Sequence, residues 1–146
     1  MSSLLQRLAN DYPQFRFAQS DRARWNASEQ TIYYTDDQPQ TLHELGHALL
    51  GHNTYRQDVE LIQIERAAWV KAQQLAPQYG LSIDNDTVEE ALDSYRDWLH
   101  SRSKCPQCHQ TGWQDSHDLT YHCPNCQCVW RASDGRQARM RRIKTK

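Results

Sequence analysis

Residues 43–47 read His-Glu-Leu-Gly-His, a spacing of side chains that can assemble a hydrolytic metal site. On a helix, residues four apart lie on one face, one turn along, so His43 and His47 can both point an imidazole nitrogen at one zinc ion. Glu44 lies beside them and can reach a water on that ion. In HExxH hydrolases the two histidines bind zinc and the glutamate is the general base. We therefore predict a catalytic zinc bound by His43 and His47, with Glu44 as the catalytic residue that activates the zinc-bound water.

A second interpretation of Glu44 stays open at this point. The segment Thr41-Leu-His-Glu44 also fits a capping box, in which the glutamate only satisfies the backbone at the start of a helix. That interpretation leaves the paired histidines unexplained.

A catalytic zinc site needs a third protein ligand, and the sequence offers three candidates. His52 follows His43 by nine residues, about 180° around a continued helix, and Gly51 is expected to end the helix first. Glu60 and Glu65 differ by five residues, so they cannot both face one metal, and Glu60 follows a polar stretch. Glu65 lies in an otherwise apolar stretch, where a buried carboxylate needs a partner such as zinc. We favour Glu65 over Glu60 and His52.

All five cysteines lie between positions 105 and 128, in two Cys-x-x-Cys knuckles and one further residue. Cys105 and Cys108 form the first knuckle, and Cys123 and Cys126 the second. Two such knuckles at this separation are typical of a zinc ribbon. A closed site of four thiolates leaves no position for water, so we expect a structural zinc here. Cys128 is an alternative to Cys126, but the spacing of the knuckle favours Cys126.

Periodicity predicts an α+β fold with a small antiparallel sheet, an HExxH helix with further packed helices, and a C-terminal zinc ribbon. The helix that carries the motif should start after Asp36 or Asp37, with Pro39 in its first turn, and run to about Gly51. The other expected elements are helices over residues 2–10, 56–78 and 88–102 and strands over 15–18 and 31–34. We expect three parts: a metallopeptidase domain over residues 1–102, the ribbon over 103–131 and a basic, disordered tail over 132–146.

The charge of the chain is unevenly distributed. Residues 131–146 carry seven Lys or Arg and one Asp, a net charge of +6, so the rest carries −7 within the overall −1. A basic tail on an acidic body suggests an anionic partner such as nucleic acid, and a solvated tail is the plainer interpretation. Phosphate contacts are expected from Arg131, Arg136, Arg139, Arg141, Arg142, Lys144 and Lys146, and base stacking from Trp113, Tyr121 and Trp130.

No apolar run approaches the roughly 18 residues that a membrane-spanning helix needs, and the first 15 residues lack the apolar core of a signal peptide. Clustered cysteines in a reducing compartment indicate a metal site rather than disulfides. We therefore expect a cytoplasmic protein with no membrane partner.

The segment HELGHALLGH, followed by a glutamate with an aromatic residue four positions later (Glu65 and Trp69), resembles the ImmA/IrrE family of zinc metallopeptidases. The likeness covers about residues 1–80. It implies His43, His47 and Glu65 as zinc ligands and Glu44 as the base. Arg66 follows Glu65 where the family usually has alanine, and the added ribbon is similar to that of SprT-like metallopeptidases, whose third ligand is a histidine.

These observations together predict a zinc-dependent metallo-endopeptidase that cleaves an intracellular protein or peptide. The strand over residues 32–34 precedes the motif helix, so its edge is expected to pair with an extended substrate. Tyr55 and His52 are candidates for stabilising the oxyanion. Two other functions stay open: a nucleic-acid-binding adaptor with an inert HExxH domain, and a zinc hydrolase acting on a non-peptide amide.

Overall fold

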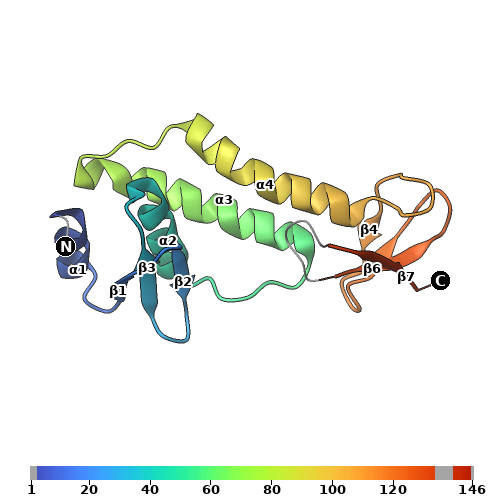
Figure 1. Cartoon of the computed structure of the whole chain (residues 1–146), viewed down its shortest axis with the longest axis horizontal. Coiled ribbons are helices and arrows are strands. Elements are labelled where there is room, and N and C mark those ends of the chain that lie inside the picture. Colours follow the sequence, from blue (N-terminus) through green and yellow to red (C-terminus); the bar gives the residue numbers. More distant parts are fainter. Residues whose placement is uncertain (1–2, 134–139, 146) are drawn as a thin grey trace. The chain divides into compact units, whose positions relative to one another are not determined.

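The computed structural model describes residues 3–133 and 140–145 and confirms the α+β class, with an HExxH helix and a C-terminal cysteine cluster consistent with a zinc ribbon (Figure 1). Arg136, Arg139 and Lys146, which were expected to contact phosphates, lie outside these residues. In chain order the elements are α1 (Ser3–Asp11), β1 (Arg16–Gln19), β2 (Arg24–Asn26), β3 (Thr31–Tyr34), α2 (Gln38–Leu50), α3 (Asp58–Leu75), the 3-10 turn η1 (Ala76–Tyr79), α4 (Asn85–Ser103), β4 (Trp113–Gln114), β5 (Tyr121–His122), β6 (Val129–Ala132) and β7 (Arg142–Lys144).

The chain forms two compact units. The first contains the chain up to Thr54 together with Gln63–Glu89, and the second contains Tyr55–Ile62 together with the chain from Glu90 onward. The expected boundary after residue 102 is therefore not where the chain divides. The start of α3 and most of α4 belong with the ribbon because buried polar contacts, described below, hold them to it.

The sheet of the first unit has the strand order β1-β3-β2. It is mixed rather than wholly antiparallel, since β1 pairs with β3 in parallel and β2 pairs with β3 antiparallel. β2, which the sequence did not indicate, follows β1 after a four-residue loop and places Trp25 opposite Ile32. Because β3 is the central strand, its edges are both taken, and the expectation that it pairs with a substrate is wrong. The side chain of Ile32 is fully buried, and β3 packs against α2.

The helix that carries the HExxH motif begins and ends where the sequence predicts. Asp37 is the N-cap, its carboxylate accepting the backbone N–H of Gln40 at 3.0 Å, and Pro39 lies in the first turn. Gly51 ends the helix in the left-handed conformation at φ 71°. The capping-box interpretation of Glu44 is wrong, because Thr41 lies inside the helix and its hydroxyl donates to the carbonyl of Asp37.

The two long helices differ slightly from the expected ranges. α3 ends at Leu75, since Pro77 cannot supply the N–H that a continuing helix needs, and η1 carries the chain on to Gly80 at φ 72°. α4 begins at Asn85, three residues before the expected Val88. Its first turn is held by Asp84, whose carboxylate accepts the N–H of Thr87 at 2.8 Å.

The second unit contains an antiparallel sheet in the order β4-β5-β6-β7. The tail was expected to be disordered, but Arg142–Lys144 forms β7 and pairs with β6. The pairing is favoured because β6 would otherwise present an open edge, and because the Arg142 guanidinium donates to the carbonyl of Lys104. The core of this sheet is the stacked pair Tyr121 and Trp130, both buried, with ring centroids 5.5 Å apart.

Among the described residues, no helix combines the length and the apolar character needed to cross a bilayer.

Candidate metal centres

The first candidate centre lies in the first unit, where α2 contributes His43 and His47 and α3 contributes Glu65. His43 Nε2 lies 2.8 Å from Glu65 Oε2, His47 Nε2 lies 3.1 Å from the same oxygen, and the two Nε2 atoms lie 3.1 Å apart. A tetrahedral ion with bonds of about 2.0–2.1 Å holds its ligand atoms roughly 3.3 Å apart. The three atoms therefore already have close to the spacing that one bound metal ion imposes.

All three residues are buried, although each carries a group that prefers water. Burial alone would raise the pKa of the Glu65 carboxyl, but the hydrogen bonds from His43 and His47 and their nearby charge outweigh it and lower the pKa to about 2. Glu65 is therefore a carboxylate at any ordinary pH, as a metal ligand must be.

The other candidates for the third ligand lie elsewhere. Glu60 accepts the backbone N–H of Arg56 and is not in this group. His52 lies behind His47 instead of beside it, with its Nδ1 2.9 Å from His47 Nδ1. A histidine that ligates through Nε2 usually has a partner on its other nitrogen, which fixes the ring and its tautomer. His52 thus occupies the place of a supporting residue. Burial and, to a lesser degree, the nearby His47 lower the pKa of His52.

Glu44 is buried at the edge of the same group. Its Oε1 lies 4.0 Å from His43 Nε2 and accepts a hydrogen bond from Gln40 Nε2 at 2.9 Å. The carboxylate is thus next to the three potential ligands and is not one of them. Gln40 was not singled out in the sequence, although its spacing of four from Glu44 on one helix face could have indicated the contact.

The ring of His43 is held from the other side by Trp69, whose ring stacks on it with centroids 4.3 Å apart. His43 Nδ1 is buried and has no hydrogen-bond partner among the described residues. The ring of His43 is therefore held by this stacking and by the contact of its Nε2 with Glu65, whereas His47 has a partner on both ring nitrogens.

Gly46, between the two histidines, allows α2 and α3 to approach closely. A Cβ atom at this position would lie 2.5 Å from the backbone oxygen of Ala68, well inside van der Waals contact. Ala68 follows Glu65 by nearly one turn, so the same contact that requires a glycine brings the carboxylate to the histidines. The sequence contains this signal, but only as a small residue inside the motif.

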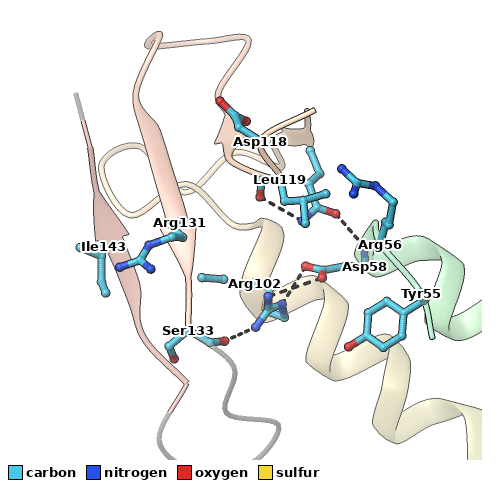
Figure 2. A pocket seen from close by; sticks show the side chains of 11 residues that line it. Tyr55, Arg56, Asp58, Arg102, Asp118, Leu119, Arg131, Ser133 and Ile143 are labelled. Carbon is cyan, nitrogen blue, oxygen red and sulfur yellow. Dashed lines mark hydrogen bonds and ion pairs between the residues drawn. The ribbon is translucent and has the colours of Figure 1, made fainter. Parts of the chain in front are cut away.

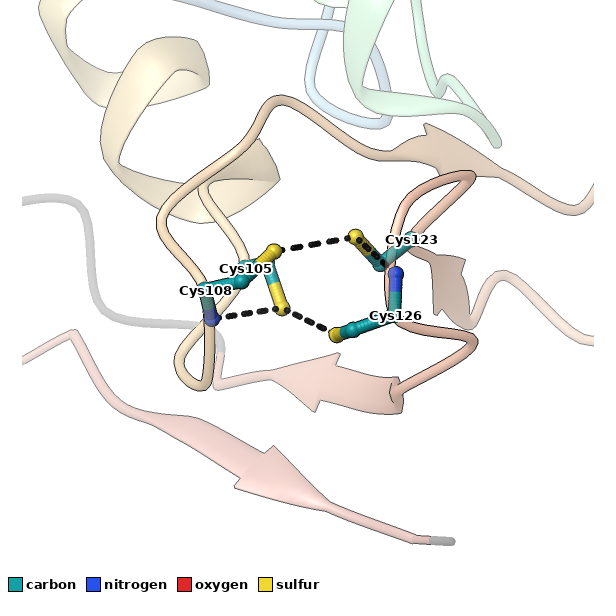
Figure 3. A group of neighbouring side chains, drawn as sticks. All are labelled: Cys105, Cys108, Cys123 and Cys126. Carbon is teal, nitrogen blue, oxygen red and sulfur yellow. Dashed lines mark hydrogen bonds between the residues drawn. The ribbon is translucent and has the colours of Figure 1, made fainter.

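The second candidate centre is the group of four cysteines in the second unit (Figure 3). Cys105 Sγ lies 3.6 Å from Cys126 Sγ, and Cys108 Sγ lies 3.4 Å from Cys123 Sγ. A tetrahedral ion with metal–sulfur bonds of about 2.3 Å separates its ligands by roughly 3.8 Å. The four thiols form the grouping predicted from the sequence, and they could hold a metal ion.

The two knuckles have the same backbone geometry. In the first, Cys105 Sγ accepts the N–H groups of Gln107 and Cys108 at 3.4 and 3.5 Å, and Cys123 Sγ accepts the corresponding pair in the second. Burial opposes ionisation of the Cys105 thiol, but these N–H groups and the neighbouring cysteines lower its pKa to about 6. The first knuckle therefore favours a thiolate at Cys105.

Cys128 is not part of the group, and Cys126 fills the fourth position. The Cys128 thiol is buried, which raises its pKa, while its carbonyl accepts the N–H of Cys123.

Burial also excludes Tyr121 and Trp130 from stacking on bases. Of the three expected aromatics, Trp113 alone is exposed, and it stacks on His122 with centroids 4.5 Å apart.

A buried polar network in the second unit was not indicated by the sequence. Asp58 accepts hydrogen bonds from Arg102 Nε at 2.7 Å and from the Tyr121 hydroxyl at 2.6 Å. Figure 2 shows Arg102 reaching from Asp58 to the carbonyl of Ser133, at the base of a cleft of about 490 Å³ whose other wall carries Arg131. The network ties α3, α4 and the ribbon sheet together, which is why the unit boundary runs through both helices.

A third group, Asp115, Asp118 and His122, is partly exposed. Its two carboxylates are already occupied by hydrogen bonds within their own turn, to the N–H groups of His117, Asp118 and Thr120. It therefore gives no independent sign of a metal.

Comparisons with known proteins give no further identification. No protein-family model matches the chain, and neither the curated proteins nor the solved structures contain a significant match.

Proposed function

We propose that the chain is a cytoplasmic, zinc-dependent metallo-endopeptidase that cleaves a protein or peptide, with zinc at both candidate centres. The observation that carries the proposal is the convergence of His43 Nε2, His47 Nε2 and a Glu65 oxygen. Two imidazoles and one carboxylate are the donor set of catalytic zinc sites that keep a position open for water. Four thiolates form a closed set, so the ribbon zinc would be structural.

The chain's own residues can divide the reaction between them. Bound at the three ligands, zinc would supply a Lewis acid that polarises the scissile carbonyl and lowers the pKa of a coordinated water. Glu44, whose Oε1 lies 4.0 Å from His43 Nε2, accepts the proton of the attacking water and transfers it to the leaving amine. Gln40 holds Glu44 Oε1, which keeps the carboxylate turned toward the ligands.

The substrate can bind in an extended conformation along β2. This strand is at the edge of the sheet, and it contacts the motif helix α2. Addition of a peptide strand to an exposed edge is a common mode of recognition, because the backbone supplies the hydrogen bonds without regard to sequence.

The proposed kinship with ImmA/IrrE metallopeptidases is supported by the order of elements. An N-terminal helix, a small sheet, the motif helix and a helix bearing Glu65 follow one another, which is the order of elements in members of that family. The aromatic residue at the expected spacing, Trp69, stacks on the ligand His43.

The test replaces Glu44 with Gln, an isosteric change that removes the base and keeps a hydrogen-bonding side chain. Zinc-loaded protein is incubated with a mixture of peptides from denatured proteins, and new termini are identified by mass spectrometry. We expect the wild type to bind two zinc ions per chain. We expect Glu44→Gln to keep both and to lose about 10²- to 10⁴-fold in cleavage rate.

The matched control is Glu90→Gln, at an exposed position of α4, which should cleave like the wild type. Equal cleavage by Glu44→Gln would refute the proposed base. One zinc per chain and no cleavage by the wild type would favour the nucleic-acid-binding adaptor.

Nucleic-acid contact through the ribbon is a second proposal. Arg131, Arg141 and Lys144 are exposed on or beside β6 and β7, and Trp113 is 53% exposed. Deleting residues 132–146 would also remove β7, so the sharper test changes these three basic residues to Gln. The substitution should weaken binding to a generic DNA or RNA duplex and to a single strand, and it should make that binding depend less on salt concentration. Equal binding by variant and wild type at low salt would refute this role.

A further inference from the structure

A cleft of about 350 Å³ lies in the first unit, next to the centre formed by His43, His47 and Glu65 (the His/Glu centre) but outside it. β2 and the turn after it form one wall, and the C-terminal end of α2 with the segment that follows forms the other. Six of its lining residues are Trp25, Ser28, Gln30, Ala48, His52 and Asn53.

His52 connects this cleft to the centre, and it is fixed there by contacts on three sides. Its Nδ1 lies 2.9 Å from the outer nitrogen of His47. Its backbone N–H donates to the carbonyl of His47 at 3.0 Å, and its own carbonyl accepts the indole N–H of Trp25 at 2.9 Å. One imidazole ring therefore separates the cleft from a candidate metal ligand.

The distance suits a substrate bound at the centre. The ring centroids of His47 and His52 are 5.1 Å apart, and an extended peptide advances about 3.3 Å per residue. The cleft thus begins one ring beyond a candidate ligand, so the side chain expected to enter it is one a few residues from the scissile bond. Trp25 belongs to the edge strand β2, so a peptide lying along that strand passes the opening.

The lining determines the chemistry of the occupant. None of the residues that line the cleft is Asp, Glu, Lys or Arg. A charged side chain would lose hydration there and find no opposite charge, which is unfavourable. An indole face and an alanine offer apolar contact, while the hydroxyl of Ser28 and the amides of Gln30 and Asn53 offer hydrogen bonds.

We propose that this cleft is a specificity subsite that accepts an uncharged, apolar or aromatic side chain of the substrate. As a substrate site it rests on the proposed peptidase function. The binding preference itself does not, because it can be measured without cleavage.

The first experiment uses zinc-loaded full-length protein and four probes: the N-acetyl amides of phenylalanine, leucine, lysine and aspartate. The indole N–H signal of Trp25, assigned by its loss in Trp25→Phe, reports binding in NMR titrations. We expect saturable shifts for the phenylalanine and leucine probes with dissociation constants on the order of 1 mM, and at least tenfold weaker binding of the charged probes.

Two substitutions test the location. Asn53→Trp places a large side chain on an exposed lining position and should weaken binding of the phenylalanine probe at least tenfold. Thr54→Trp adds the same bulk at the neighbouring exposed position, which is not in the lining, and should leave binding unchanged.

The subsite would be refuted by equal binding of charged and uncharged probes, by no shift with any probe, or by Asn53→Trp binding like the wild type. In the peptide mixture, Asn53→Trp should also alter the residue preferred at one fixed position from the cleavage site, and an unchanged preference would contradict the proposal. Probe binding without any cleavage would instead refute the peptidase function and leave the cleft's preference standing.

Discussion

Replacing Gly46 with Ala tests whether the close approach of α2 and α3 builds the His/Glu centre. The new Cβ would lie 2.5 Å from the backbone oxygen of Ala68 and 3.2 Å from its carbonyl carbon. Ordinary contact begins near 3.4 Å, so the helices must separate by up to about 0.9 Å. Backbone atoms cannot rotate away as a flexible side chain can.

A displacement of that size is large on the scale of metal coordination. Ligand distances hold to about ±0.2 Å, and Glu65 lies on the helix that must move, while His43 and His47 lie on the other. Overpacking of this kind costs about 1–3 kcal/mol. The metal-free variant relaxes by separating the helices. Zinc binding must then bring the helices back together, which costs the same overpacking energy. We therefore expect zinc affinity at this centre to fall about 5- to 150-fold.

The assay is a competition titration with a chromogenic chelator, read together with thermal unfolding. The matched variant is Gly112→Ala in the ribbon, whose Cβ would lie 2.5 Å from the Trp130 ring and 2.7 Å from the His122 carbonyl. Gly46→Ala should weaken only the His/Glu site, and Gly112→Ala only the four-cysteine site. Zinc affinity and unfolding temperature of Gly46→Ala equal to the wild type would refute the idea that this contact sets the ligand geometry.

Three further outcomes follow from the structure. His52→Ala removes the partner of a proposed ligand and should weaken zinc binding about 10- to 100-fold in the same titration; unchanged affinity would exclude a supporting role. Asp58→Ala leaves the buried guanidinium of Arg102 without its carboxylate partner and should lower the free energy of unfolding in urea by about 3–5 kcal/mol. Arg66→Ala removes an exposed ion pair and should lower it by under about 1 kcal/mol, and similar losses for the two variants would contradict this reasoning. Cys126→Ala should abolish metal binding at the ribbon and Cys128→Ala should retain it, as metal analysis would show, and the reverse result would reassign the fourth thiol.

Features encoded by short spacings could be predicted from the sequence. The positions of His43, Glu44 and His47 on one helix follow from its period, and its start at Asp37 and end at Gly51 follow from capping chemistry. The cysteine knuckles are equally local, because each is formed within four residues. Such features depend on backbone geometry that neighbouring residues determine without the rest of the fold.

Features that depend on residues far apart in the chain needed the tertiary structure. Glu65 reaches the histidines from 18 positions beyond His47, and periodicity left it as one of three candidates. Packing of α3 against Gly46 brings it into place, and the indole N–H of Trp25 helps to hold His52 behind His47. Pairing decided that β3 is a central strand and that β7 joins the ribbon sheet. Burial decided that Tyr121 and Trp130 form a core. Strand order and burial are set by which distant surfaces exclude water together, and no short stretch of sequence specifies that.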